Sequence, residues 1–501
     1  MRPSSRLSAR AFWGLANWAL PLAVVFLVSP RLLHLLGAER FGALMIALVT
    51  PIIACQLDFG VTSAALRRFS ARLTSGRVDA GTTLFTLSAA LLIIGIILGV
   101  TLWITAAPVS SVLGFTDTLG VAQGPALVKA CAIWTVVSLG TLMPGVLARA
   151  AQALILTSIL QTVATVVLWA GAWILLRGDY SLVSVVGLGI GLSIVTAGAT
   201  LVAMRRLVEW RGPVEFSSRL LSEEARFSGG IFAAQAAGAL VNQGDRMLVS
   251  ALGSPAMAGL YALSANVANK SVAAVVAITS FVFPHAAALK SAGHHDRTIG
   301  LVHALDRSIA ALMMPMLVPG LLLAGEFLRL WLGHFATPEL VVAFRILVVA
   351  FGVLCFAVPV SNVLVAGGES VMPALFSWLT VVIAFGTMVI AVPRFGLLGA
   401  AWAMLLGYST SLIFAAVARR RLGIPRAEGR WRLWSGLIIG AAIQVGLIEA
   451  LRPMVTGWLS LLAVGATAWA SSYLARALVL ALTPEEVALL GRLSRPVSRD
   501  P

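Results

Sequence analysis

Hydrophobic residues in this 501-residue chain form long, nearly uninterrupted runs, and polar residues are confined to short segments between them. A helix that crosses the hydrocarbon core of a bilayer needs about 20 consecutive, mostly apolar residues. Runs of this length predict about fourteen membrane-spanning helices, near residues 12–33, 41–65, 82–106, 125–148, 151–176, 181–203, 228–252, 256–284, 302–325, 341–365, 371–392, 396–418, 433–450 and 454–480. The pattern therefore predicts an all-α polytopic membrane protein.

The composition excludes a soluble enzyme. Hydrophobic residues make up 59% of the chain and charged residues only 11%, against about 25% charged residues in ordinary soluble domains. The three cysteines, Cys55, Cys131 and Cys355, lie far apart inside apolar runs, which favours neither a disulfide framework nor a metal site. Motifs for phosphate binding, zinc hydrolysis and nucleophilic triads are missing from the sequence, so we expect no metal, no cofactor and no ATP hydrolysis.

The basic residues predict an orientation. The chain has 36 Lys plus Arg against 20 Asp plus Glu, and such an excess is typical of cytoplasmic loops. With the N-terminus inside, 25 of these cations fall on the cytoplasmic side, 6 on the opposite side and 5 within spans. This asymmetry predicts an even number of spans with both termini cytoplasmic. The basic start of the chain resembles that of a signal peptide, but no cleavage site follows, so the first run is expected to be a retained helix.

The spacing of the spans predicts two halves. Spans one to six and seven to twelve each occupy about 200 residues, and a charged segment separates them. We expect an N-terminal lobe at 1–203, a cytoplasmic linker at 204–227, a second lobe at 228–418, a basic cytoplasmic loop at 419–432, and two further helices with a cytoplasmic tail at 433–501. The linker alternates arginine with glutamate, which fits either an interfacial amphipathic helix or a solvated connection.

A similar phrase recurs at the junction of the first two helices of each half. Residues 36–44 read LGAERFGAL, and residues 252–261 read LGSPAMAGLY. Each phrase supplies one glycine where a helix must stop, at Gly37 and Gly253, and another where the next helix can pack closely on a neighbour, at Gly42 and Gly259. Because six helices separate the two copies, the halves would be related by an axis along the membrane normal.

Several motifs resemble those of a known family. They are LLGAERFGALMIAL at 35–48, Asp58-Phe59-Gly60, Arg67-Arg68, Asp245-Arg246-Met247-Leu248 followed by Gly253, Gly259-Leu260-Tyr261-Ala262, Pro284, and RFGLLGAAWA at 394–403. Together they are similar to the polysaccharide-biosynthesis flippases, which belong to the multidrug, oligosaccharidyl-lipid and polysaccharide exporter superfamily. The resemblance covers nearly the whole chain.

The resemblance implies two six-helix lobes facing a central cavity, two extra C-terminal helices, and transport by alternating access in the bacterial inner membrane. The implied cargo is an undecaprenyl-diphosphate-linked oligosaccharide, and the implied partners are membrane lipids and the polysaccharide polymerase and export machinery. The uncharged first helix departs from the pattern of the lipid II branch.

Two rival functions stay open. An ion-coupled multidrug antiporter of the same superfamily would favour a cavity rich in acids and aromatics. A membrane glycosyltransferase or polymerase acting on the same lipid would require a catalytic acid and sizeable outward loops, whereas the outward segments here are short.

Ionisable groups inside spans are costly and are candidates for function. A diphosphate requires fixed cations, and arginine binds it best through its bidentate fork. The candidate substrate-binding residues are Arg246, Lys270, Lys129, Arg345, Asn242, Gln235, Asn266 and Asn269, and the candidate structural or coupling residues are Asp58 and Asp245.

Helical spacing groups some of these side chains. Gln235, Asn242 and Arg246 are seven and four residues apart, which predicts one shared face. Asn266, Asn269 and Lys270 fall within an arc of about 100°.

Structural alternatives remain for each group. Arg246 could belong to an ion pair, Lys129 and Arg345 could extend to the membrane interface, and the asparagines could join helices by hydrogen bonds.

Overall fold

The computed structural model describes residues 3–74, 80–207, 215–280, 295–366, 369, 371–424 and 430–478. Regular secondary structure in these ranges is helical throughout, and ten stretches of helix there are long and apolar enough to cross a membrane. The prediction of an all-α polytopic membrane protein is confirmed. Parts of the predicted segments lie outside the described residues, among them 75–79 of the N-terminal lobe, 208–214 of the linker, 281–284 of the eighth span with Pro284, 425–429 of the basic loop, and 479–501 of the last span and tail.

The chain divides into two compact units, which we call unit 1 (Met1–Leu260) and unit 2 (Tyr261–Pro501). Unit 1 contains α1 (Pro3–Gln56), α2 (Val61–Thr74), α3 (Ala80–Ile104), α4 (Ala106–Val112), α5 (Phe115–Leu119), α6 (Gln123–Gly140), α7 (Leu142–Ala150), α8 (Leu154–Arg177), α9 (Leu182–Leu207), α10 (Ser218–Ala239), the π-helical turn η1 (Leu240–Gly244), α11 (Asp245–Leu252) and the first turns of α12 (Pro255–Ala268).

Unit 2 begins inside α12 and continues through the C-terminal helices. Its further elements are α13 (Lys270–Ser280), α15 (His295–Leu322), α16 (Ala324–Leu332), η2 (Gly333–Phe335), α17 (Pro338–Cys355), α18 (Val358–Ala366), α19 (Val371–Arg421), α20 (Arg430–Leu451), η3 (Arg452–Met454) and α21 (Trp458–Leu478).

Two of the longest helices each hold two predicted spans. In α19 the backbone leaves helical geometry at Gly396, which has φ 54°. The hydroxyls of Thr380 and Thr410 are 2.7 Å apart, although a straight helix would separate these residues by about 45 Å. The predicted eleventh and twelfth spans are therefore antiparallel and joined at Gly396. Similarly, α1 is interrupted at Gly37, with φ 72°.

The second span ends earlier than its predicted boundary at residue 65, because the chain turns after Gln56. Asp58 accepts hydrogen bonds from Gly60 N at 2.8 Å, from Thr62 N at 2.9 Å and from the Thr62 hydroxyl. A carboxylate in this position satisfies amides that have no partner within the first turn of a helix. Asp58 is almost fully buried and caps α2.

The charged segment before the seventh span is partly helical. α10 begins at Ser218, and the Ser217 hydroxyl caps it by accepting from Leu220 N at 3.2 Å. Glu224 is 4% exposed and accepts 3.0 Å hydrogen bonds from both Arg67 and Arg68. Ion pairs with α2 therefore fix the start of α10.

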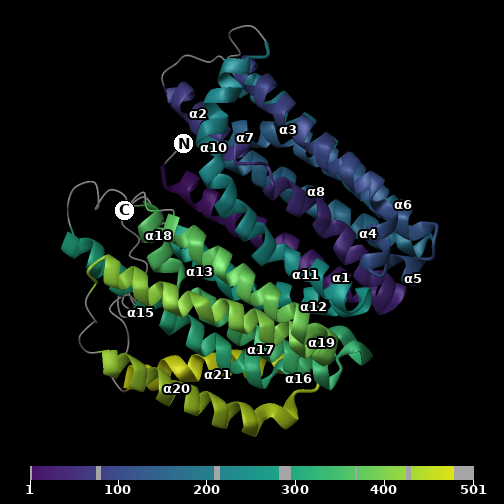
Figure 1. Ribbon diagram of the computed structural model, residues 1–501. Coiled ribbons are helices and arrows are strands. Elements are labelled where there is room, and N and C mark those ends of the chain that lie inside the picture. Colours follow the sequence, from purple (N-terminus) through teal and green to yellow (C-terminus); the bar gives the residue numbers. More distant parts are fainter. Residues whose placement is uncertain are drawn as a thin grey trace. The chain divides into compact units, whose positions relative to one another are not determined.

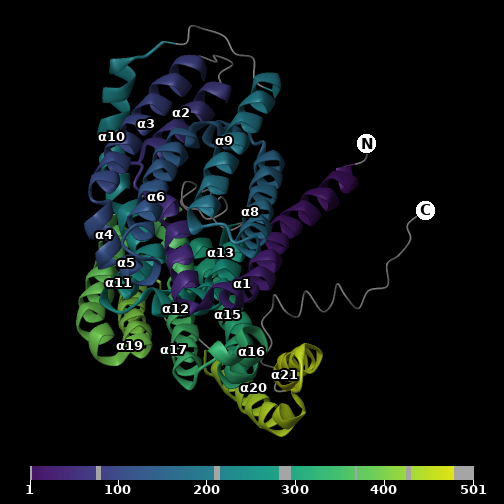
Figure 2. The same cartoon turned by 90° about the vertical axis from the view of Figure 1, so that its right-hand side faces the viewer.

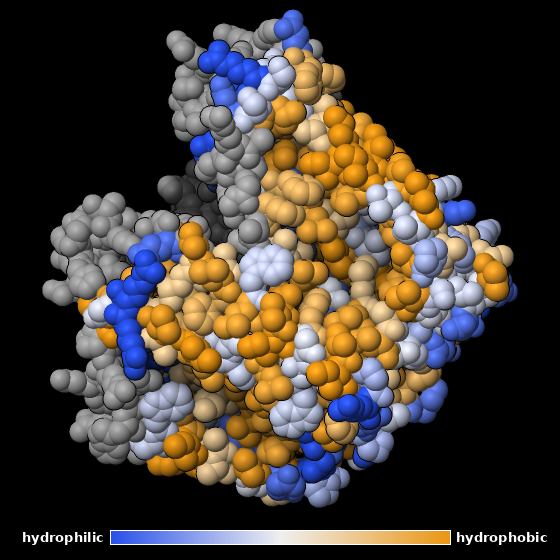
Figure 3. Space-filling view, viewed as in Figure 1, coloured by the Kyte–Doolittle hydropathy of each residue, from blue (hydrophilic) through white to orange (hydrophobic). Residues whose placement is uncertain are grey.

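In unit 1, neighbouring spans pack in succession, with α3 on α6, α6 on α9, α9 on α8 and α8 on α1 (Figures 1 and 2). Apolar side chains cover the outer surface over α3 (Figure 3), where Ile93 and Ile97 are 53% and 59% exposed. Exposed apolar side chains on long helices are the surface expected to face lipid.

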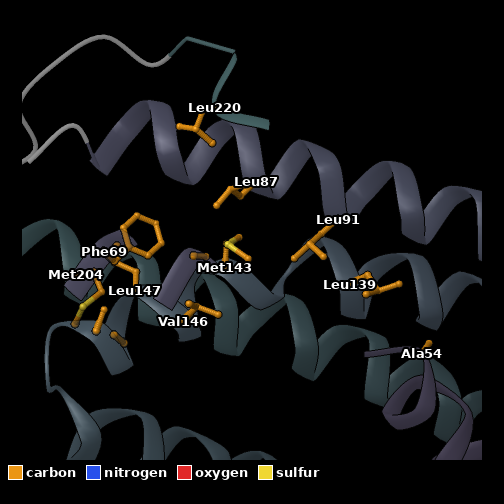
Figure 4. Packing of buried hydrophobic residues seen from close by; sticks show 13 residues of the cluster. Ala54, Phe69, Leu87, Leu91, Leu139, Met143, Val146, Leu147, Met204 and Leu220 are labelled. Carbon is orange, nitrogen blue, oxygen red and sulfur yellow. The ribbon is translucent and has the colours of Figure 1, made fainter. Parts of the chain in front are cut away.

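The core of unit 1 fixes the orientation of α7. Met143, Val146 and Leu147 of this helix are fully buried and contact Phe69 of α2 and Leu87 of α3 within one apolar cluster (Figure 4). Burial of one face of α7 directs its opposite face away from this cluster.

The recurring phrases meet in the structure. Gly253 ends α11 as its C-cap. A Cβ on Gly259 of α12 would lie 2.8 Å from the Cα of Gly42 in α1, and one on Gly42 would lie 1.7 Å from Pro255 O. The second glycine of each phrase therefore permits a close helix crossing, as expected from the sequence.

This crossing predicts the effect of adding one methyl group. Gly259→Ala should lower the thermal unfolding midpoint of the detergent-solubilised protein, by the equivalent of about 1–3 kcal/mol, because backbone must move to accommodate Cβ. Gly187→Ala is the control, since a Cβ there meets nothing within 4 Å. Equal midpoints for the two variants would contradict the role of the crossing.

The α2–α10 ion pairs give a second prediction. Glu224→Gln should destabilise the protein by about 1–2 kcal/mol, because it removes the charge that both arginines contact. Glu223→Gln is the matched control, since Glu223 is half exposed, pairs at 3.1 Å with the exposed Arg219 of its own helix and lies 3.8 Å from Arg68. Thermal unfolding measures both, and an equal loss from the control would refute the special role of Glu224.

Candidate functional site

The predicted site residues on the seventh span lie in different surroundings. Arg246 is 6% exposed in α11, and its backbone N–H donates to Asp245 Oδ1 at 2.9 Å. Gln235 of α10 donates to the Ser63 hydroxyl of α2 at 3.2 Å. Asn242 is exposed and donates to Gly238 O of its own helix at 2.7 Å. The π-helical turn η1 interrupts the spacing that grouped these residues, so the predicted common face is not continuous.

On the eighth span the helix is interrupted within the predicted group. α12 ends at Ala268 and α13 begins at Lys270, with Asn269 between them. Asn266 and Asn269 are half-buried, whereas Lys270 is exposed. Tyr261, on the same helix as Asn266, is fully buried.

Lys129 and Arg345 contact groups near the ends of helices. The Lys129 ammonium lies 5.3 Å from the centre of the Trp103 ring, near the end of α3. Arg345 Nε donates to Leu321 O at 2.8 Å. Leu321 is in the last turn of α15, where carbonyls have no partner within the helix. These contacts give both cations local structural partners.

The candidate residues are distributed over both units. Arg246, Lys129, Gln235 and Asn242 belong to unit 1, and Lys270, Arg345, Asn266 and Asn269 belong to unit 2. Their common lining of one cavity stays a prediction.

Unit 1 also contains a cavity of about 470 Å³, which we call the polar groove. Its walls come from α6, α7, α8 and α9, with Cys55 of α1, and Figure 2 shows α6, α9 and α8 side by side. The polar side chains from α8 and α9 that line it are Thr157, Gln161, Thr165, Ser193, Thr196 and Thr200. Spacings of three and four residues bring each set to one helix face.

The hydroxyl protons of three threonines in the groove are directed to the helix backbone. Thr165 donates to Gln161 O at 2.9 Å, Thr196 to Leu192 O at 2.7 Å, and Thr200 to Thr196 O at 2.7 Å. A hydroxyl has one proton and two acceptor lone pairs. These groups therefore present hydrogen-bond acceptors to the groove.

α7 closes one side of the groove and supplies the one charged side chain in its described lining. Thr141, Gly145 and Arg149 line the groove. Each is four residues from the next, so they share one face of α7, away from the face that Met143, Val146 and Leu147 bury in the apolar cluster. Arg149 is exposed, and its guanidinium forms no hydrogen bond or ion pair with any residue in the described ranges. The lining contains no carboxylate among the described residues.

The residues predicted from the sequence as a site do not include this groove, because they are ionisable and amide side chains within the predicted spans. Arg149 is one of the 25 cations that the sequence places on the cytoplasmic side, at the end of a predicted span. The detectable signal was the four-residue spacing of Thr157, Gln161 and Thr165 in an otherwise apolar run.

Solved structures share this fold. The lipid II flippase MurJ, in an inward closed conformation, has a TM-score of 0.67 at 12% identity over 94% of this chain and 100% of that chain. An inward-facing MATE family multidrug transporter has a TM-score of 0.59 at 14% identity, over 82% and 98%. The Vibrio cholerae MATE transporter VcmN, in its bent form, has a TM-score of 0.54 at 18% identity, over 83% and 97%.

Sequence comparison identifies the family. No curated protein matches the chain. The family model described as "Polysaccharide biosynthesis protein" matches residues 32–338, which include the whole polar groove. The chain therefore belongs to the polysaccharide biosynthesis protein family.

Proposed function

We propose that this protein is a flippase that moves undecaprenyl-diphosphate-linked oligosaccharide repeat units across the bacterial inner membrane for polysaccharide export. Membership of the polysaccharide biosynthesis family and the fold shared with a lipid II flippase support this proposal. The observation that carries it is the polar groove of unit 1, whose lining combines hydroxyls with an arginine and, in the described part of the chain, no acid.

The chemistry of the groove favours a saccharide over a cationic drug. A cationic ligand gains from carboxylates, which are missing from the described lining, and it is repelled by Arg149. Hydroxyls and amides instead match the hydrogen-bonding groups of a sugar, and the guanidinium matches a phosphate.

The proposed cycle is alternating access, in which binding residues face first the inner and then the outer leaflet. We place both termini in the cytoplasm, as the excess of basic residues on that side indicates. The carrier makes and breaks no covalent bond, and a polysaccharide polymerase and export machinery would consume the delivered units.

The predicted cationic residues provide a direct test. Cells that lack the protein should accumulate lipid-linked repeat units in the inner leaflet, and the wild-type chain should restore translocation. Arg246→Ala and Lys270→Ala should each slow translocation by about tenfold, and the double variant should abolish it, if these cations contact the diphosphate on a transport path outside the polar groove, because each substitution then removes one charge-assisted contact.

Protein levels measured by immunoblotting control for loss of folding, and Arg31→Ala is a control at an exposed arginine whose partner is Leu27 O of its own helix. If expression of the wild-type protein in these cells leaves the inner-leaflet pool of lipid-linked repeat units unchanged, the flippase proposal is refuted. Normal translocation by a well-expressed double variant would remove only these two residues from the site.

A further inference from the structure

We propose that the polar groove of unit 1 binds the glycosyl phosphate of the cargo in a single orientation, with the phosphate at Arg149 and the sugar along α8 and α9. This inference rests on the proposed function and assigns it a residue-level site. It is based on the distribution of donors and acceptors in the groove.

The two parts of a glycosyl phosphate need opposite partners. An ionised phosphate has only acceptor oxygens, so it must be bound by donors. Thr165, Thr196 and Thr200 have each committed the hydroxyl proton to a backbone carbonyl. These threonines therefore cannot donate to a phosphate without breaking the hydrogen bond that each hydroxyl makes to a backbone carbonyl.

Arg149 provides what the threonines lack. Its guanidinium has five N–H donors in a planar fork that suits phosphate, and no residue in the described part of the chain occupies them. It lies in the last turn of α7, and only residues 151–153 separate that helix from α8. The phosphate is therefore placed at the end of the groove formed by this turn.

The rest of the groove suits a sugar. Thr157, Gln161 and Thr165 extend for about 12 Å along α8, facing Thr196 and Thr200 of α9 across the same cavity. Sugar hydroxyls can donate to the threonine oxygens, and the Gln161 amide both donates and accepts. Trp134 lines the groove beyond these residues and donates from Nε1 to the Ser193 hydroxyl at 3.1 Å.

A metal cation would also bind oxygen acceptors, but it fits this lining poorly. Hard cations are held by carboxylate and carbonyl oxygens. The described lining has no carboxylate, and its formal charge is that of Arg149.

Binding to the purified full-length protein tests the proposal with two probes, farnesyl diphosphate and farnesyl-diphosphate-linked N-acetylglucosamine. Arg149→Gln should weaken binding of both probes by about ten- to a hundredfold, because a charge-assisted contact is lost. Arg149→Lys should retain part of the affinity, since it keeps the charge without the fork. Arg31→Gln, at an exposed arginine outside the groove, is the control.

The sugar end is tested separately by the double variant Thr165→Val and Thr196→Val. The double variant should weaken binding of the sugar-bearing probe by about five- to tenfold and leave the affinity for farnesyl diphosphate unchanged. It removes hydrogen-bond acceptors but no donor that is available to phosphate. Thr101→Val is the matched control, since Thr101 is exposed and donates to Ile97 O in the same way, outside the groove. Unchanged affinity for both probes in Arg149→Gln, or equal weakening of both in the valine variant, would overturn the assignment.

Cys55 gives a readout that needs no substitution of a groove residue. It lines the groove, whereas Cys131 and Cys355 are buried. A saturating concentration of the sugar-bearing probe should slow modification of Cys55 by a methanethiosulfonate reagent several-fold. An unchanged modification rate would place the probe outside the groove.

The site and the transport activity can fail independently. If the variants lose binding selectively, as expected, but the wild-type protein moves no lipid-linked saccharide, the site is retained and the flippase is refuted. Normal transport with normal probe binding by Arg149→Gln would retain the flippase and refute the site.

Discussion

The structure depends on one constraint, which is that polar groups within membrane-spanning helices must find partners inside the protein. Threonine and serine hydroxyls in the spans return their protons to a carbonyl one turn earlier, as Thr101 and Thr165 do. Where a helix is interrupted, a side chain replaces the missing backbone partner. Asp58 supplies acceptors to the start of α2, and Arg345 supplies a donor to the end of α15.

The same constraint explains why the fold was predictable and the site was not. Apolar runs are dictated by the bilayer, so the spans can be read from the sequence, and the glycines at 37, 42, 253 and 259 fall where the sequence placed helix ends and a close crossing. Partner choice, by contrast, depends on which helices become neighbours. The sequence shows that Lys129 and Arg345 are cations in spans, but not that an indole and a carbonyl lie beside them.

Local backbone geometry accounts for another difference. The grouping of Gln235, Asn242 and Arg246 assumed a regular helix, and the π-helical turn at 240–244 changes the spacing between them. Arg149 illustrates the opposite case. Its position at the end of a span indicates only the orientation of the chain, whereas its place in the groove follows from the burial of the opposite face of α7.

The reversal of α19 at Gly396 has a mechanical consequence. The turn is made at a single left-handed glycine, and Glu339 of α17 accepts from the next amide, Leu397 N, at 3.1 Å. A Cβ at Gly399 would overlap Ala391 O, 2.2 Å away, so the two arms are in close backbone contact beside the junction. A hairpin with so short a hinge cannot let its two arms tilt separately, and torque applied to one arm is passed to the other.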